Sequence, residues 1–137
     1  MVCFAYDDIE SWVVPYGVDV YLSQMDIVCW FWEEGIELLE KAEKNAKNEE
    51  LLRYANAFYC HYLSDMLQTR FALCKRKGDK NGMTDCLRKE RENARKLLSL
   101  MRADARIGYE ASNHYFYTER NILEKSLRTE KMEESLA

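Results

Sequence analysis

The chain has 137 residues, of which 47% are hydrophobic and 32% charged, and its net charge is −4. This length and balance indicate one packed domain, and the excess of acids excludes a surface built to neutralise the phosphates of nucleic acid. No apolar run approaches the ~20 residues that cross a bilayer, so we expect neither a nucleic-acid nor a membrane partner. One proline and five glycines leave few turns, which favours a small number of long helices.

Residues 1–17 form the least regular part of the chain. Val2, Phe4 and Trp12 are too apolar for a solvated tail, so we predict a lead-in segment that packs onto the helices. The stretch lacks the basic start of a signal peptide. We therefore expect a cytoplasmic protein if the chain is complete, and an exported one if it is part of a longer exported protein.

A first long helix is predicted over residues 18–46, where apolar side chains recur at steps of three and four. Trp30 and Phe31 widen this apolar stripe, which predicts neighbours on two sides of the helix. Gly35 interrupts the pattern at a cost of ~1 kcal/mol relative to alanine. Either a close helix crossing or a bend would explain that glycine.

Two further helices are predicted over residues 48–77 and 84–103, and the second of them could start one turn earlier. Asn48 is a plausible N-cap of the first, and Gly78 is its C-cap signal. In the second, the run 88–92 is so rich in charge that we expect it to lie in water.

The last helix is predicted over residues 118–133, with Thr118 as the N-cap. Tyr117 before the cap and Ile122 within the first turn form a plausible hydrophobic staple. The apolar residues thin out toward the end, so the tail is expected to fray.

These elements predict an all-α fold in a single domain over residues 1–137. Three long helices joined by short turns are typical of an antiparallel up-down bundle, and the shorter C-terminal helix would cover part of the remaining groove. The aromatic loop, residues 104–117, would then lie across one end of the bundle.

The aromatic loop holds the candidate site, because polar groups stand there among tyrosines. Aromatic faces beside a carboxylate and an amide suit a sugar ring, and convergent polar groups in an apolar setting are typical of a ligand pocket. The competing interpretation is structural, since a loop crossing a bundle can anchor itself through tyrosine rings and hydroxyls. A small enzyme using Glu110 with His114 is a third interpretation.

Metal chemistry has little support in the sequence. Glu110 and His114 are four residues apart, as are His61 and Asp65, so either pair could share a helix face. A di-iron bundle needs repeated Glu-x-x-His motifs, which are absent, and the five cysteines form no CxxC pair. We therefore expect no metal and no cofactor, free thiols at the cysteines, and a hydrogen-bonded histidine at position 61.

The run 104–115, Asp-Ala-Arg-Ile-Gly-Tyr-Glu-Ala-Ser-Asn-His-Tyr, resembles a signature in large secreted glycoside-hydrolase-like proteins of polysaccharide-degrading gut bacteria. There it belongs to the helical C-terminal region. The upstream pattern is also similar, with Trp32 and Gly35 in one helix, Arg70-Phe71 in the next, and a Leu-Met-Arg-x-Asp ending at Asp104. The resemblance covers residues 18–125.

The resemblance implies an accessory helical module, because in such proteins the catalytic residues belong to a large upstream barrel that 137 residues cannot supply. We expect no catalytic residue here, and as partners a second copy, an upstream catalytic domain or a carbohydrate. The alternative is a purely structural or oligomerising bundle without a small-molecule ligand. The residues expected to face a ligand are Arg106, Tyr109, Glu110, Asn113, His114 and Tyr115.

Overall fold

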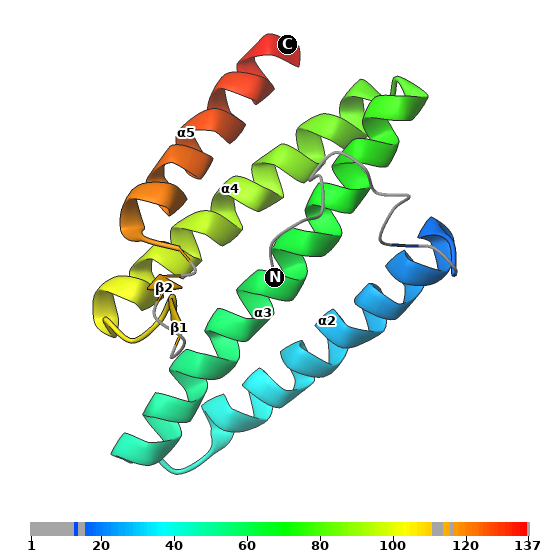
Figure 1. Cartoon of the computed structure of the whole chain (residues 1–137). Helices are drawn as coiled ribbons and strands as arrows, with labels where there is room; N and C mark the ends of the chain where they lie inside the picture. Colours follow the sequence, from blue (N-terminus) through cyan, green and yellow to red (C-terminus); the bar gives the residue numbers. More distant parts are fainter. Residues whose placement is uncertain (1–12, 14–15, 111–113, 116, 137) are drawn as a thin grey trace.

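The computed structural model describes residues 13, 16–110, 114–115 and 117–136. The described part is an all-helical bundle, which confirms the predicted fold class at that level. Figure 1 shows four helices side by side in chain order, with a very short strand pair near one end. They are α2 (Val18–Lys41), α3 (Ala46–Lys77), α4 (Lys80–Ala103) and α5 (Glu119–Leu136), and the strands are β1 (Tyr109–Glu110) and β2 (His114–Tyr115).

Several helix boundaries differ from the predicted ones, and at α3 the predicted cap was the wrong residue. Helix α2 ends at Lys41, because Ala42 is already extended. Asn45, not Asn48, caps α3, since its side chain accepts a hydrogen bond from the Asn48 N–H. Asp79 caps α4 in the same way through the Gly82 N–H, so α4 begins four residues before the predicted start.

Other predicted helix ends are confirmed. Gly78 closes α3 in the left-handed region, with φ 68°. Thr118 and Asn121 exchange side-chain and backbone hydrogen bonds at the start of α5. Tyr117 packs against the same cluster as Ile122, as a hydrophobic staple requires. The tail of α5 remains helical to Leu136, beyond the predicted end at residue 133.

The core consists of two separate clusters that share α3. The larger cluster joins α3, α4 and α5, and Cys60 at its centre is 0% exposed. The smaller joins α2 to α3 through Met25, Cys29 and Met66. Helix α2 is therefore attached to α3 by the lesser of the two clusters. The buried members of the larger cluster are Ala57, Cys60, Ala94, Leu97, Met101, Ile107 and Ile122.

The cysteines of the described part carry free thiols. Burial raises the pKa of Cys60 and of Cys86 to about 11, so both remain protonated at neutral pH. Such thiols act as small hydrophobes, as the sequence suggested.

The predicted solvation of the charged run 88–92 is wrong at Glu90 and holds only in part at Arg91, whose side chain is 20% exposed. Arg88 and Lys89 are exposed and both pair with Asp85, whereas Glu90 is 4% exposed. Glu90 stands three residues after Leu87, which places both on the inward stripe of α4. The burial of Glu90 therefore follows from its position on the helix and not from the charges of its neighbours in the sequence.

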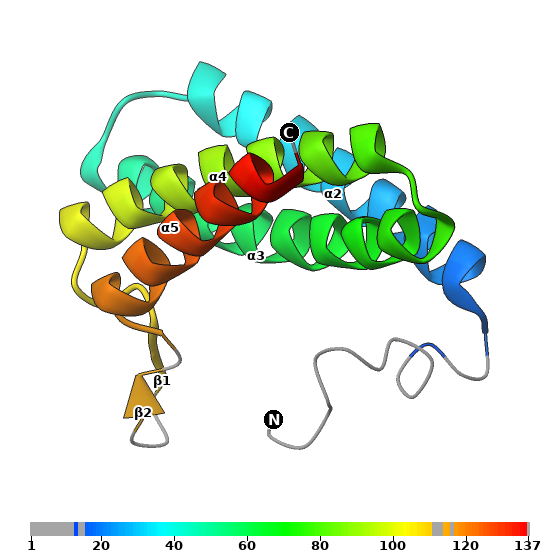
Figure 2. The ribbon, with the colours of Figure 1, turned by 90° about the horizontal axis from the view of Figure 1, so that it is seen from above.

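The aromatic loop forms a small hairpin that projects away from the helices instead of crossing their end. Strands β1 and β2 pair antiparallel, with Tyr109 opposite Tyr115 and Glu110 opposite His114. Figure 2 shows the strand pair extending from the helical layer where α4 ends and α5 begins. Glu110 and His114 are thus cross-strand partners, and the helical spacing considered for them as metal ligands does not apply.

Gly35 lies inside α2, and of the two explanations offered for it, a close helix crossing or a bend, the close crossing is wrong. A Cβ built at Gly35 meets nothing within 4 Å outside its own helix and chain neighbours. No neighbouring element therefore requires the absence of a side chain at this position.

We expect Gly35→Ala to raise the free energy of unfolding by about 0.5–1 kcal/mol, because alanine is the better helix former and has room. Chemical denaturation measures the change. Gly82→Ala is the matched control within α4, where the new Cβ would lie 2.5 Å from Asp79 Oδ2 and 2.6 Å from Cys74 Sγ. That control should lose stability, and a Gly35→Ala protein that also loses stability would contradict the open space seen at Gly35.

Candidate functional site

Arg106 is the one predicted site residue whose side chain the structure describes, and it makes contacts within the chain. Its Nε and Nη2 donate to the two carboxylate oxygens of Asp104 at 2.9 and 2.7 Å, and Nη2 also donates to Glu50 at 2.6 Å. The guanidinium carbon lies 5.4 Å from the centre of the Tyr54 ring. Arg106 thereby fastens the start of the loop to α3.

The Arg106 guanidinium and backbone N–H both donate to the Asp104 carboxylate, which lowers its pKa to about 2. The same contacts raise the pKa of Arg106 above its ordinary value. Two carboxylates therefore hold this arginine, which gives it an anchoring role in the described structure.

The remaining predicted site residues fall at the margin of what the structure describes. The backbones of Tyr109, Glu110, His114 and Tyr115 form the strand pair, but their side chains lie outside the described part. Asn113 lies outside it altogether. Their role toward a ligand remains a prediction.

His61 and Tyr117 tie the end of the hairpin to α3. The imidazole Nε2 lies 2.7 Å from the Tyr117 hydroxyl, and the two rings are 4.9 Å apart. Burial, together with the positive charge of Lys125, lowers the pKa of His61, and burial raises the pKa of Tyr117 to about 12. Both groups are neutral at pH 7, and His61 is a hydrogen-bonded structural histidine, as predicted.

A polar network that was not predicted joins α3, α4 and α5. Lys125 pairs with Glu90, and the Ser64 hydroxyl donates to Glu90 at 2.7 Å. Lys125 and Gln68 in turn donate to the Ser64 oxygen at 2.7 and 2.8 Å. The Ser64 proton and lone pairs are thus engaged, and Glu90 holds the Lys125 charge. This network fixes three helices, and it does not present a free nucleophile.

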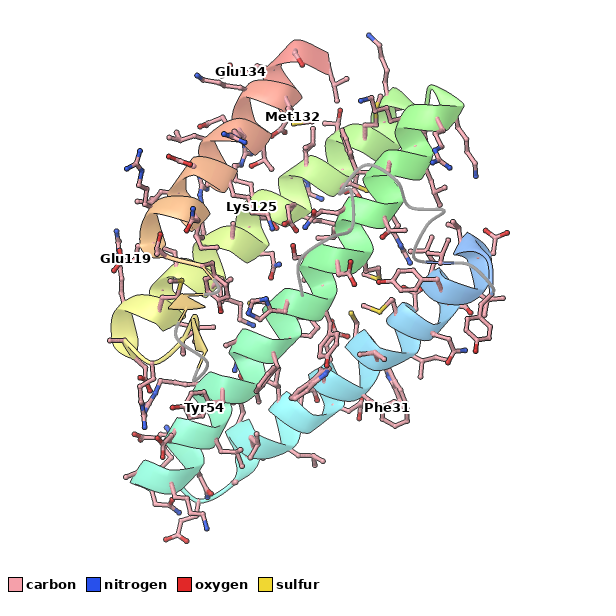
Figure 3. The ribbon with its side chains drawn as sticks, in the orientation of Figure 1. Phe31, Tyr54, Glu119, Lys125, Met132 and Glu134 are labelled. Carbon is pink, nitrogen blue, oxygen red and sulfur yellow. The ribbon has the colours of Figure 1, made fainter. Side chains whose placement is uncertain are left out.

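Helix α2 carries a second apolar stripe that was visible in the sequence only as an excess of apolar residues. Ile27, Phe31 and Leu38 are 47%, 62% and 69% exposed. Spacings of four and seven residues put them on one helix face. Met25, Cys29 and Ile36 occupy the opposite face, which packs on α3. Figure 3 shows Phe31 on the edge of α2 that points away from α3.

We call this exposed stripe the outer face of α2; it consists of Val20, Ile27, Trp30, Phe31 and Leu38. The sequence predicted neighbours on two sides of α2. Within the described residues α3 covers one side, and the outer face is exposed. Nearby, Trp32 stacks on Phe58 and Tyr62 of α3, with ring centres 5.8 and 6.0 Å apart. The apolar surface therefore continues as half-exposed aromatic rings beside the α2–α3 seam.

By helical position Asp19, Asp26 and Glu37 lie on the Trp30 side of the outer face, and Glu34 lies within it. Helix α2 contains six exposed acids and a single lysine. Some already have partners, since Asp26 pairs with Arg70, and Glu33 accepts a hydrogen bond from Tyr59. Asp19, Glu34 and Glu40 have no ion pair described within the structured part of the chain. The outer face is therefore apolar with a negative border.

Among the described residues, no group of three or more His, Cys, Asp or Glu side chains is placed to hold a metal ion, and no helix is long and apolar enough to span a membrane. Comparison with known protein families, with curated proteins and with solved structures finds no match.

We expect the Asp104–Arg106 pair to make stability dependent on acid pH. The folded pKa of about 2 lies below the ordinary 3.8, so the pair stabilises fully above pH 3.8 and its contribution is lost as the pH falls toward 2. Denaturation at several pH values should show wild type losing its advantage over Asp104→Asn across that window. Arg106→Gln should remove the same dependence. An unchanged pH profile in both variants would contradict this assignment.

Proposed function

We propose that this chain is a non-catalytic helical interaction module that receives a basic amphipathic helix of a partner protein on the outer face of α2. The single observation that carries the proposal is the apolar stripe on that face, opposite the residues that attach α2 to α3. Contiguous exposed apolar surface rimmed by polar groups is typical of protein interaction sites.

The composition of the stripe suits a helix-in-groove contact. Trp30 and Phe31 are large, rigid anchors whose ring centres lie 4.8 Å apart, and they are 52% and 62% exposed. Aromatic anchors of this kind supply most of the binding energy in many interfaces. The neighbouring rings of Phe58 and Tyr62 extend the surface along the seam with α3.

The charge of α2 indicates the chemistry of the partner. By helical position Glu34 lies within the stripe and Asp19 beside it, and neither has a described ion pair, so lysines or arginines of a partner can complement them. A second copy that offers its own α2 would instead bring acids against acids. This argues for a basic partner helix over self-association through α2.

An antiparallel up-down arrangement of the helices is part of the proposal. The linkers 42–45 and 78–79 are short, which favours reversal of the chain. Contacts between α3 and α4 also run in opposite senses, since Asn93 bonds the Cys60 carbonyl, whereas Glu90 meets Ser64 further along α3.

The relationship to helical accessory regions of secreted glycoside-hydrolase-like proteins also remains a proposal. It rests on the run 104–115, of which residues 109–110 and 114–115 form the strand pair. In that setting the basic partner helix would belong to an adjoining domain. A contribution of the projecting hairpin to glycan binding is compatible with this arrangement.

We expect a labelled leucine–lysine helical peptide to bind the full chain saturably, as measured by fluorescence anisotropy. Phe31→Asp should weaken that binding by roughly tenfold or more, because it loses the burial of an aromatic side chain. Leu127→Asp on α5 is the matched control, since Leu127 is 58% and Phe31 62% exposed. The Leu127→Asp control should bind the peptide like wild type. Added salt should lower the affinity of wild type and of this control for the peptide.

A leucine–glutamate peptide of equal length tests the charge argument and should bind more weakly. Three outcomes would overturn the proposal. They are no saturable binding, equal loss in the two variants, or light scattering that shows a dimer which Phe31→Asp converts to a monomer. In the last case a second copy occupies the outer face.

A further inference from the structure

A line of exposed residues runs along α2 at alternating steps of four and three. These steps average 3.5 residues, the period at which a second helix can stay in contact along the whole length of the first. All members of the line are exposed, and together they span about 27 Å of helix. We call this line the heptad row; it consists of Val20, Gln24, Ile27, Phe31, Glu34 and Leu38.

Glu34 is the single charge in the heptad row. It lies between Phe31 and Leu38, and Gln24 is the other polar member of the row. Within the described part of the chain, neither Glu34 nor Gln24 has a hydrogen bond or an ion pair. A carboxylate enclosed in an apolar helix contact costs free energy unless a cation pairs with it. Glu34 therefore favours a helix with a lysine or arginine at one defined position, as single polar residues fix the register of coiled coils.

A small pocket opens at the start of the heptad row. Its volume is about 360 Å³, and two of its lining residues, Val20 and Gln24, belong to the row itself. The other lining residues are Val13, Tyr16 and Tyr21. Side chains that fill pockets of this kind supply much of the binding energy of an interface. The pocket therefore offers a place for one large apolar side chain of a helix that lies on the row.

We propose that a partner helix packs lengthwise along the heptad row, with a lysine or arginine opposite Glu34 and a large apolar side chain in the pocket beside Val20. This inference rests on the proposed function, because it specifies how the basic helix lies on the outer face of α2. Val20 and Glu34 are two heptads apart, which corresponds to about 21 Å of helix. The partner accordingly carries its large apolar residue and its basic residue two heptads apart.

The heptad row disfavours a second copy of the chain as the occupant. In a parallel pair of α2 helices, equivalent positions meet, so the two Glu34 carboxylates would face each other. Like charges that meet in a helix contact are destabilising. The same carboxylate attracts a basic partner.

Fluorescence anisotropy with two labelled three-heptad peptides tests the position of the charge on the full chain. Both peptides carry leucine at the row-facing positions, except for one such position that is lysine in the first peptide and glutamate in the second. The lysine peptide should bind wild type more tightly. Glu34→Lys should invert this order, with a change of roughly tenfold for each peptide. Glu40→Lys is the matched control, since it makes the same change of charge at an exposed position on another face of α2, and it should keep the wild-type order.

Two further variants test the lengthwise arrangement. Val20→Asn and Leu38→Asn change the two ends of the heptad row without adding charge, and each should weaken binding of the lysine peptide several-fold. Leu123→Asn on α5 is the control, because Leu123 is 41% and Val20 48% exposed, and it should bind like wild type. Circular dichroism checks that each variant is folded.

The outcomes separate this inference from the proposed function. An unchanged order of the peptides in Glu34→Lys, the same inversion in Glu40→Lys, or full binding by Val20→Asn and Leu38→Asn would overturn lengthwise docking, and the proposed function would stand if Phe31→Asp still weakened binding. No saturable binding of either peptide would overturn both. Light scattering that shows a dimer lost in Val20→Asn and Leu38→Asn would assign the heptad row to a second copy and would also overturn the inference.

Discussion

The structure depends on α3 being buried on two sides at once. One side meets α4 and α5 through Cys60, which is fully buried, and the other meets α2 through Met66. A helix that serves two cores must be apolar around much of its circumference, and α3 accordingly lacks a single clean polar face. The remaining helices arrange themselves around this requirement.

The consequence is that the two outer helices are attached by different kinds of contact. Helix α5 buries only Ile122 and Thr129, and it is held largely by polar contacts, the Glu90–Ser64–Lys125 network and an ion pair of Arg91 with Glu133 at 2.8 Å. Helix α2 packs on α3 through its buried cluster and through Trp32 stacked on Phe58, while its aromatic outer face remains in solvent. A large exposed apolar face of this kind is suited to a role in binding.

Much of the fold could be predicted from periodicity, because apolar steps of three and four are a local property of each helix. Gly78 and Thr118 could also be identified as caps, because a cap depends on the residue type at a helix end and is likewise a local property. Asn45 was missed because two asparagines stand three residues apart, and the sequence does not tell which one turns extended. Glu90 was missed because local charge density outweighed its position beside Leu87.

The candidate site was harder to predict, because it depends on which residues from distant segments meet. Nothing local indicates that Ser64, Glu90 and Lys125 come together, and the spacing of Glu110 and His114 fitted a helix as well as a strand pair. The second stripe of α2 did have a local signal in Trp30 and Phe31. These additional apolar residues predicted a neighbouring element on two sides of α2. The packing of α2 on α3 then determined which side stayed exposed.

Native-state hydrogen exchange of the isolated chain tests the central claim most directly, because it measures the opening free energy of each helix separately. Since the smaller cluster is the buried apolar contact of α2 with α3, the amides of α2 should exchange through a local opening below the global unfolding free energy. The amides of α3 around Cys60 should exchange most slowly. Amides of Met25 and Cys29 as well protected as those around Cys60 would contradict the account.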